Sequence, residues 1–302
     1  MTSVQGLISS ELLTEFGQLV LAGTISGINY ALIATSFWLI YATTGTFHVA
    51  HAVAYMIAGY ATIVVCTWAK LPLWEGALGA ILTAALFGIV VEAFVYRPLR
   101  ARGASIMGIF LASLGVATAG PNVIQLVFGP EVFQAPDVPN RTLSFGTITV
   151  TSLHLFMAAV ALVLILAVNQ FLEKSKIGNA ISAVRTNPVL AMSVGISIDR
   201  VFLFVFGLGS LLVGVAGYFA TLDSAASSTM GLQPMLYGLI GVFLGGVASI
   251  RGAGLGGFIL GFLLVFTGLF LSQDLGIIFV FVILAAILIF RPEGLLKGDA
   301  TR

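Results

Sequence analysis

The chain has 302 residues, of which 59% are hydrophobic and only 8% are charged, and its formal net charge is +1. A soluble domain averages about 25% charged residues, so this composition excludes a soluble globular protein and predicts an integral membrane protein. The near-neutral charge argues against a nucleic-acid-binding protein, which needs a basic face. A single cysteine, Cys66, excludes an internal disulfide and any multi-cysteine metal site.

Long apolar runs predict an all-α fold, a polytopic bundle of about eight or nine membrane-spanning helices. The runs are continuous, whereas the strands of a membrane β-barrel would alternate. In chain order the segments are 17–41, 46–68, 73–96, 105–128, 151–172, 200–222, 236–250, 253–272 and 275–290. The second begins with the polar stretch TGTFHVAH and the seventh is short and broken by glycine, so either is a candidate re-entrant segment.

Basic residues predict the orientation of the bundle. If the loops after the third, fifth and seventh segments share one side with the C-terminus, that side holds all 13 basic residues except Lys70 and Arg141. The positive-inside rule makes that side cytoplasmic. Nine crossings then place the N-terminus outside, and eight place it inside. Pro98 and Pro292, each directly after an arginine, are expected to end helices.

The predicted cytoplasmic loop, residues 173–199, contains a short helix with its own start and stop signals. Asn187 is a candidate N-cap and Pro188 suits the first helical position. Gly195 suits the left-handed residue after the last turn. The apolar side chains between them either lie back on the bundle or enter the groove of a partner protein.

Polar and small residues at membrane depth are candidates for a translocation path. They are Asn29, His48, His51, Gln125, Gly245 and Gly246. The two histidines are three residues apart and share a helical face, but two histidines alone do not predict a metal site. The glycines at spacing four between 241 and 261 are typical of close helix packing, and lining of the path is the alternative.

Residues 178–220 resemble the coupling loop and following helix of permeases from ABC importers of the branched-chain amino acid type, the LivH class. The matching loop residues are Gly178, Ala183, Arg185, Asn187, Pro188, Ala191 and Gly195. Further stretches match in the same order, at 28–45, 44–61, 95–100, 238–261 and 290–298. Around His51 the family's usual N-F-A-H-G core and its following acidic residue are altered, which leaves the substrate open.

The resemblance implies one permease domain over residues 1–302, with the loop 173–199 engaging cytoplasmic ABC ATPase subunits. It implies a non-catalytic subunit in the bacterial cytoplasmic (inner) membrane, with a cytoplasmic C-terminus. Its further partners would be a second permease subunit, either a homologue or a second copy, an extracytoplasmic solute-binding protein and the lipid bilayer. The expected solutes are branched-chain amino acids or related small molecules such as amides and urea.

The sequence contains no GxxxxGK[ST] phosphate loop, so we expect this chain to bind no cofactor and ATP to bind the partner ATPase. The alternative function is a stand-alone secondary transporter or channel. Such a protein needs coupling carboxylates or a selectivity ring inside the membrane, and the apolar segments offer almost none.

Overall fold

The computed structural model describes residues 2–138, 140–146, 148–270, 273–291 and 294–296. Its first half contains α1 (Thr2–Thr44), α2 (His51–Thr62), the π-helix η1 (Ile63–Trp68), α3 (Leu73–Val91), the π-helix η2 (Glu92–Tyr96), α4 (Arg97–Ala101) and α5 (Ile106–Phe128). A hairpin of β1 (Thr142–Phe145) and β2 (Ile148–Thr151) follows. The second half contains α6 (Ser152–Lys174), α7 (Lys176–Thr186), α8 (Pro188–Ser193), α9 (Ile198–Asp223), α10 (Leu232–Gly245), α11 (Ile250–Phe270) and α12 (Gln273–Phe290).

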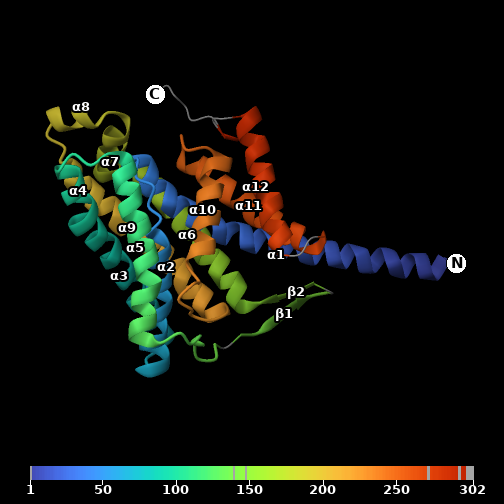
Figure 1. The fold of residues 1–302 in the computed structure, drawn as a ribbon. Coiled ribbons are helices and arrows are strands. Elements are labelled where there is room, and N and C mark those ends of the chain that lie inside the picture. The colour runs from blue at the N-terminus through green and yellow to red at the C-terminus, as the bar shows by residue number, and fades with distance from the viewer. Residues whose placement is uncertain (1, 139, 147, 271–272, 292–293, 297–302) are drawn as a thin grey trace.

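The elements form a helical bundle with two distinct ends. Helices α4, α7 and α8 lie at one end, which we call the α8 end, and the β1–β2 hairpin lies toward the other, the hairpin end (Figure 1). Seven helical stretches are long and apolar enough to cross a membrane: Thr14–Thr44, His51–Trp68, Leu73–Ala101, Ile106–Phe128, Ser152–Lys174, Ile198–Asp223 and Ile250–Gly268, among the described residues. The predicted polytopic helical bundle is confirmed.

The second and seventh predicted segments, the two candidate re-entrant segments, form helices of different length. The second segment runs as one helical stretch, His51–Trp68, long enough to cross, but its polar opening at residues 45–48 is not helical. The seventh forms α10, whose 14 residues extend about 21 Å at 1.5 Å per residue. A helix of that length is too short to cross a hydrocarbon core of about 30 Å.

Pro98 does not end the third segment, contrary to the sequence prediction. The helical stretch continues through Pro98 to Ala101, and the π-turn of η2 directly precedes it. Proline has no N–H and its ring clashes with the carbonyl of the preceding turn. A wider π-turn beside proline changes the local hydrogen-bond pattern, so the chain can stay helical.

The hairpin was not predicted, and it is attached to the first half of α1. Strands β1 and β2 pair antiparallel, with Thr142 opposite Thr151. The Gln18 side chain of α1 donates to the Thr149 carbonyl at 2.7 Å and accepts from the Thr149 N–H at 2.9 Å. These two bonds place this part of α1 at the hairpin end.

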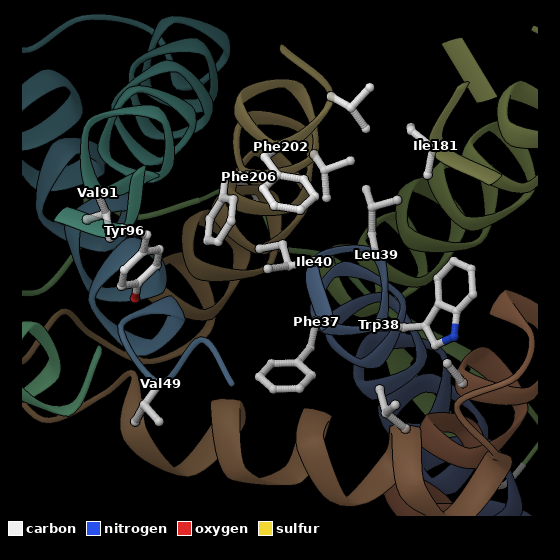
Figure 2. Close-up of a cluster of buried hydrophobic side chains, with 14 of the residues drawn as sticks. Phe37, Trp38, Leu39, Ile40, Val49, Val91, Tyr96, Ile181, Phe202 and Phe206 are labelled. Carbon is white, nitrogen blue, oxygen red and sulfur yellow. The ribbon is translucent and has the colours of Figure 1, made fainter. Parts of the chain in front are cut away.

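Glycines bring α1, α10 and α11 into backbone contact at the centre of the fold. A Cβ atom on Gly256 of α11 would clash with the Gly241 carbonyl and the Gly245 backbone of α10. A Cβ on Gly261 would lie 2.7 Å from the Cα of Gly27 on α1. Glycine spacing of this kind lets helices approach closely where no hydrophobic effect drives them together. Aromatic side chains such as Phe37 and Phe206 fill the adjoining core (Figure 2).

Replacing Gly256 with leucine tests this packing. We expect Gly256→Leu to destabilise the folded chain by about 2–3 kcal/mol because the side chain overlaps backbone atoms that cannot move aside. Gly268→Leu on the same helix is the control, since nothing lies within 4 Å of a Cβ there. Thermal unfolding in detergent measures both variants, and equal melting temperatures would contradict the packing account.

Candidate functional site

Helix α8 has the caps that the sequence predicts at both of its ends. The Asn187 side chain accepts a hydrogen bond from the Leu190 N–H at 3.0 Å. Gly195 has φ +87°, and the Ile196 N–H donates to the Ala191 carbonyl at 3.0 Å. This last bond is the long hydrogen bond of a Schellman stop. The two caps fix a short helix that could not persist by propensity alone.

Helix α7 is capped by a residue that sequence reasoning missed. The Ser175 hydroxyl accepts from the Gly178 N–H at 2.8 Å, and serine three residues before a free N–H is the available signal. A Cβ on Gly178 would collide with the Leu172 carbonyl at the end of α6. Gly178 therefore permits the sharp turn that directs the chain from α6 into α7. Pro188 then occupies the first position of α8, as predicted.

The apolar side chains of α8 and of its C-cap residue, Val194, point away from the bundle. Val189, Leu190, Met192 and Val194 are 72%, 63%, 53% and 70% exposed, whereas Ala191 is buried. Helix α8 lies at one extremity of the molecule (Figure 1). The sequence left open whether these side chains lie back on the bundle or enter the groove of a partner. In the described part of the chain, nothing covers the four exposed side chains.

Arg185 links the loop to the core of the bundle. Its guanidinium lies 5.3 Å from the centre of the Trp38 ring on α1, a geometry that attracts a cation to the ring face. The Trp38 indole in turn donates to the Val247 carbonyl, between α10 and α11, at 2.7 Å. Partial burial lowers the pKa of the Arg185 guanidinium. Ala183 packs against the same core, so α7 is joined to α1 and to the α10–α11 turn.

His48 and His51 lie close together but are completely buried. Their rings are 5.4 Å apart. His48 Nδ1 is hydrogen-bonded to the Tyr96 hydroxyl and His51 Nε2 to the Ser36 hydroxyl, both at 2.9 Å. Phe206 packs edge-on against His48 at 4.9 Å, and Figure 2 shows Phe206 and Tyr96 within the core. The two histidines thus form a buried hydrogen-bonded cluster that connects the start of α2 to α1 and η2.

Asn29 lines a cavity of about 190 Å³ on the hairpin side of α10. A second cavity of about 300 Å³ adjoins it, and the two share Tyr30 and Pro234. The Tyr30 and Tyr237 rings meet edge to face at 5.3 Å. Gln233 donates to the Tyr237 hydroxyl at 2.9 Å. The first two turns of α10 therefore place the polar groups of Gln233 and Tyr237 at these cavities.

Sequence reasoning missed Gln233 and Pro234 as part of this cavity pair. The available signal was the polar stretch DSAASSTMGLQP, which begins at Asp223 and lies between two apolar runs. This stretch joins the end of α9 to the first turn of α10, where Gln233 and Pro234 line the cavities. Asp223 lines the Asn29 cavity and pairs with His154 at 2.7 Å.

The other predicted path residues lie elsewhere. Gln125 on α5 donates to the Ser228 hydroxyl at 2.8 Å and so holds the segment between α9 and α10. Gly245 and Gly246 are buried where α10 meets α11, and the Leu296 N–H donates to the Gly245 carbonyl at 3.0 Å. Gly246 has φ +105° and ends α10. The structure brings none of these three to the Asn29 cavity.

Within the described ranges, no group of three or more His, Cys, Asp or Glu side chains could hold a metal ion. The buried Glu92 carboxylate of η2 is bonded to Arg100. Arg97 and Asp199 pair at 2.8 Å and join α4 to α9. The ionic contacts among these residues therefore fasten helices at the α8 end.

Comparison with known proteins gives a family and several relatives. The family model described as "Branched-chain amino acid transport system / permease component" matches residues 19–289. The permease protein LivH of a high-affinity branched-chain amino acid transport system from Escherichia coli is 28% identical, over 95% of this chain and 97% of its own length. BraD from Pseudomonas aeruginosa, also named as such a permease, is 24% identical over 92% and 95%.

A probable LivH from Methanocaldococcus jannaschii is 26% identical, over 83% of this chain and 81% of its own length. Among solved structures, PsaBC from Streptococcus pneumoniae in complex with Fab has 12% identity and a TM-score of 0.48, with 89% of this chain and 90% of that one covered. The family model covers all seven long helical stretches from α1 to α11 except the first residues of α1. The chain is therefore a multi-pass membrane protein that belongs to the family of branched-chain amino acid transport system permease components.

Proposed function

We propose that this permease subunit carries branched-chain amino acids, or related small solutes such as amides and urea, through the bacterial inner membrane as part of an ATP-driven importer. The family match and the printed names of LivH and BraD support this proposal. Full-length coverage of these relatives means that the likeness extends over the whole bundle rather than one motif. The chain acts as a conduit, and ATP is bound and hydrolysed on partner subunits.

The observation that carries the energy-coupling part is the uncovered apolar face of α8. Four exposed apolar side chains on a doubly capped helix, outside the candidate spans, suit insertion into a groove of a cytoplasmic ATPase subunit. The caps make the helix rigid, so a movement of the ATPase is passed to α6 and α9, which flank the loop. The coupling loop in this proposal comprises residues 173–199, including Gly178, Ala183, Arg185, Asn187, Pro188, Ala191 and Gly195.

The charge distribution supports a cytoplasmic α8 end. The described basic residues in or beside α4, α7, the end of α6, the starts of α9 and α11 and the end of α12 are Arg97, Arg100, Arg102, Lys174, Lys176, Arg185, Arg200, Arg251 and Arg291. Lys70 and Arg141 belong to the hairpin end, and Lys297 and Arg302 lie outside the described residues. By the positive-inside rule the α8 end faces the cytoplasm. The hairpin end then receives solute from an extracytoplasmic binding protein.

The cavities beside Tyr30 are the proposed stretch of the translocation path in this subunit. They lie against the first two turns of α10, and they combine apolar walls with Asn29, Gln233 and Tyr237. A second permease subunit, a homologue or a second copy, would complete the path. In this proposal the buried His48 and His51 do not contact the solute. They hold the start of α2 in place against α1 and η2.

A stand-alone secondary transporter is not favoured. It requires an ionisable group that titrates inside the path. Glu92 is fully buried and bonded to Arg100, and Asp223, which lines the Asn29 cavity, is paired with the partly exposed His154. Family membership does not favour it either.

Gly195→Val tests the stop of α8. Valine is strained by about 1 kcal/mol or more in the left-handed conformation, so we expect α8 to lose its fixed shape and solute-stimulated ATP hydrolysis by the assembled transporter to fall several-fold. Gly195→Asn is the matched control because asparagine tolerates this conformation. Equal hydrolysis and transport rates in both variants would refute a role for the stop.

Leu190→Asp tests the exposed face of α8. Placing a carboxylate in an apolar groove removes a buried contact and adds an unpaired charge, so we expect about tenfold less ATPase to co-purify with the permease. Val132→Asp is the control, because Val132 is 62% exposed in the loop after α5, away from α8. Undiminished capture of the ATPase by Leu190→Asp would rule out this docking surface.

Asn29→Leu tests the proposed path. We expect solute uptake to fall several-fold while ATPase capture stays normal, because the change alters only the cavity beside Tyr30. Asn122→Leu is the matched control, since the Asn122 amide bonds to the Thr118 carbonyl of its own helix. If both leucine variants transported at the wild-type rate, the cavity would not be part of the path.

A further inference from the structure

A polar cavity of about 550 Å³ opens at the α8 end, between α1, α6, α7 and the start of α11. Its polar lining includes Asn169, Asn179, Ser182, Ser249, Arg185 and Arg251. It lies apart from the exposed apolar face of α8 and from the cavities beside Tyr30. We call it the headgroup cavity.

The headgroup cavity carries a positive charge. Arg185 rests on Trp38 and has no acidic partner in the described part of the chain. Arg251 pairs with Glu173 at 2.5 Å, and both side chains remain exposed, at 69% and 49%. Two guanidinium groups thus face one carboxylate. An arginine that keeps free donors in a polar cavity is suited to bind phosphate oxygens.

An apolar groove of about 350 Å³ continues from this cavity. The two share Asn169, Ile250 and Arg251. The apolar lining of the groove is Ile28, Ala31, Leu162, Leu166, Leu255 and Phe258. Leu162 and Leu166 are 45% and 60% exposed, so the groove is open along α6.

Three helices lead from the cavity into the groove in the same direction. The lining runs from Trp38 back to Ile28 on α1, from Asn169 back to Leu162 on α6, and from Arg251 forward to Phe258 on α11. At 1.5 Å per residue these stretches extend about 10–15 Å away from the α8 end. The polar cavity therefore lies at the membrane boundary and the groove reaches toward the bilayer interior.

We propose that the headgroup cavity and the groove together bind one anionic phospholipid, with its phosphate between Arg185 and Arg251 and one acyl chain along α1, α6 and α11. Basic pockets between transmembrane helices on the cytoplasmic side attract anionic lipid headgroups. A free anion would fill only the polar half of this shape. A phospholipid matches both parts, because its charged headgroup lies at the membrane surface and its acyl chain extends toward the bilayer interior.

The environment of Arg185 adds to the fit. Partial burial lowers the pKa of Arg185, because desolvation disfavours its charge. A phosphate beside it offsets that cost. Such a lipid would hold α7 against α1 and α6 and so steady the loop that carries α8.

Native mass spectrometry of the assembled transporter tests the proposal. The complex is delipidated in mild detergent and offered phosphatidylglycerol or phosphatidylcholine with identical acyl chains. We expect retention of phosphatidylglycerol in preference to phosphatidylcholine. Arg185→Gln and Arg251→Gln should each reduce it about fivefold, the effect of one basic residue beside an anionic headgroup. Arg185→Lys should retain most of the binding.

Matched controls separate this site from the general charge of the surface. Arg200→Gln removes a guanidinium at the same end but outside the cavity, and it should leave retention unchanged. Leu166→Trp fills the groove and should reduce retention, whereas Leu82→Trp on α3, where Leu82 is 64% exposed, should not. Thermal unfolding of each complex verifies that the variants are folded.

Three results would overturn the proposal. The first is equal retention of the two lipids by the wild-type complex. The second is displacement of phosphatidylglycerol by inorganic phosphate alone, which would assign the cavity to a free anion. The third is crosslinking of Leu166→Cys to the second permease subunit in the assembled transporter, which would show that protein covers the groove. The only native cysteine, Cys66, is buried and does not compete in that experiment.

Discussion

Backbone contact between α1, α10 and α11 is the constraint on which the rest of the structure depends. Glycines on α10 and α11 leave no room for side chains between the two helices, and Gly261 meets α1 in the same way. This contact fixes α10, a helix too short to cross the membrane, so that its first turn faces Tyr30. It also fixes Val247, which accepts the Trp38 hydrogen bond. The contact between α1, α10 and α11 therefore determines the positions of both the proposed path and the loop that carries α8.

The polar groups inside the bundle strengthen the same arrangement. His48 and His51 join the non-helical segment before α2 to α1 and η2. Glu92 of η2 pairs with Arg100 of α4, and Arg97 of α4 pairs with Asp199 of α9. A buried charge without a partner would be costly, and the buried Glu92 has Arg100 as its partner. Rigid helices joined by specific contacts can move as bodies between two states, which an importer requires.

Much of the fold could be predicted from hydropathy, because a membrane requires continuous apolar helices of fixed length. The caps of α8 could also be predicted, since Asn187, Pro188 and Gly195 are local signals of one helix. The continuation of helix through Pro98 and the β1–β2 hairpin could not. The hairpin depends on contacts between distant residues, such as Gln18 with Thr149. The continuation through Pro98 depends on the π-turn of η2, which hydropathy does not predict. Of the two cavities beside Tyr30 the sequence predicted only Asn29, because Gln233 and Pro234 reach them through the packing of α10 beside α1.

The central claim is that this chain is a conduit driven by an ATPase bound at its α8 end. The most direct measurement is leucine accumulation in proteoliposomes that contain the permease subunits, with or without the ATPase, in the presence of ATP, the binding protein and a proton gradient. The account predicts accumulation against the gradient of leucine only when the ATPase and ATP are present. Uphill accumulation driven by the proton gradient without the ATPase would contradict it.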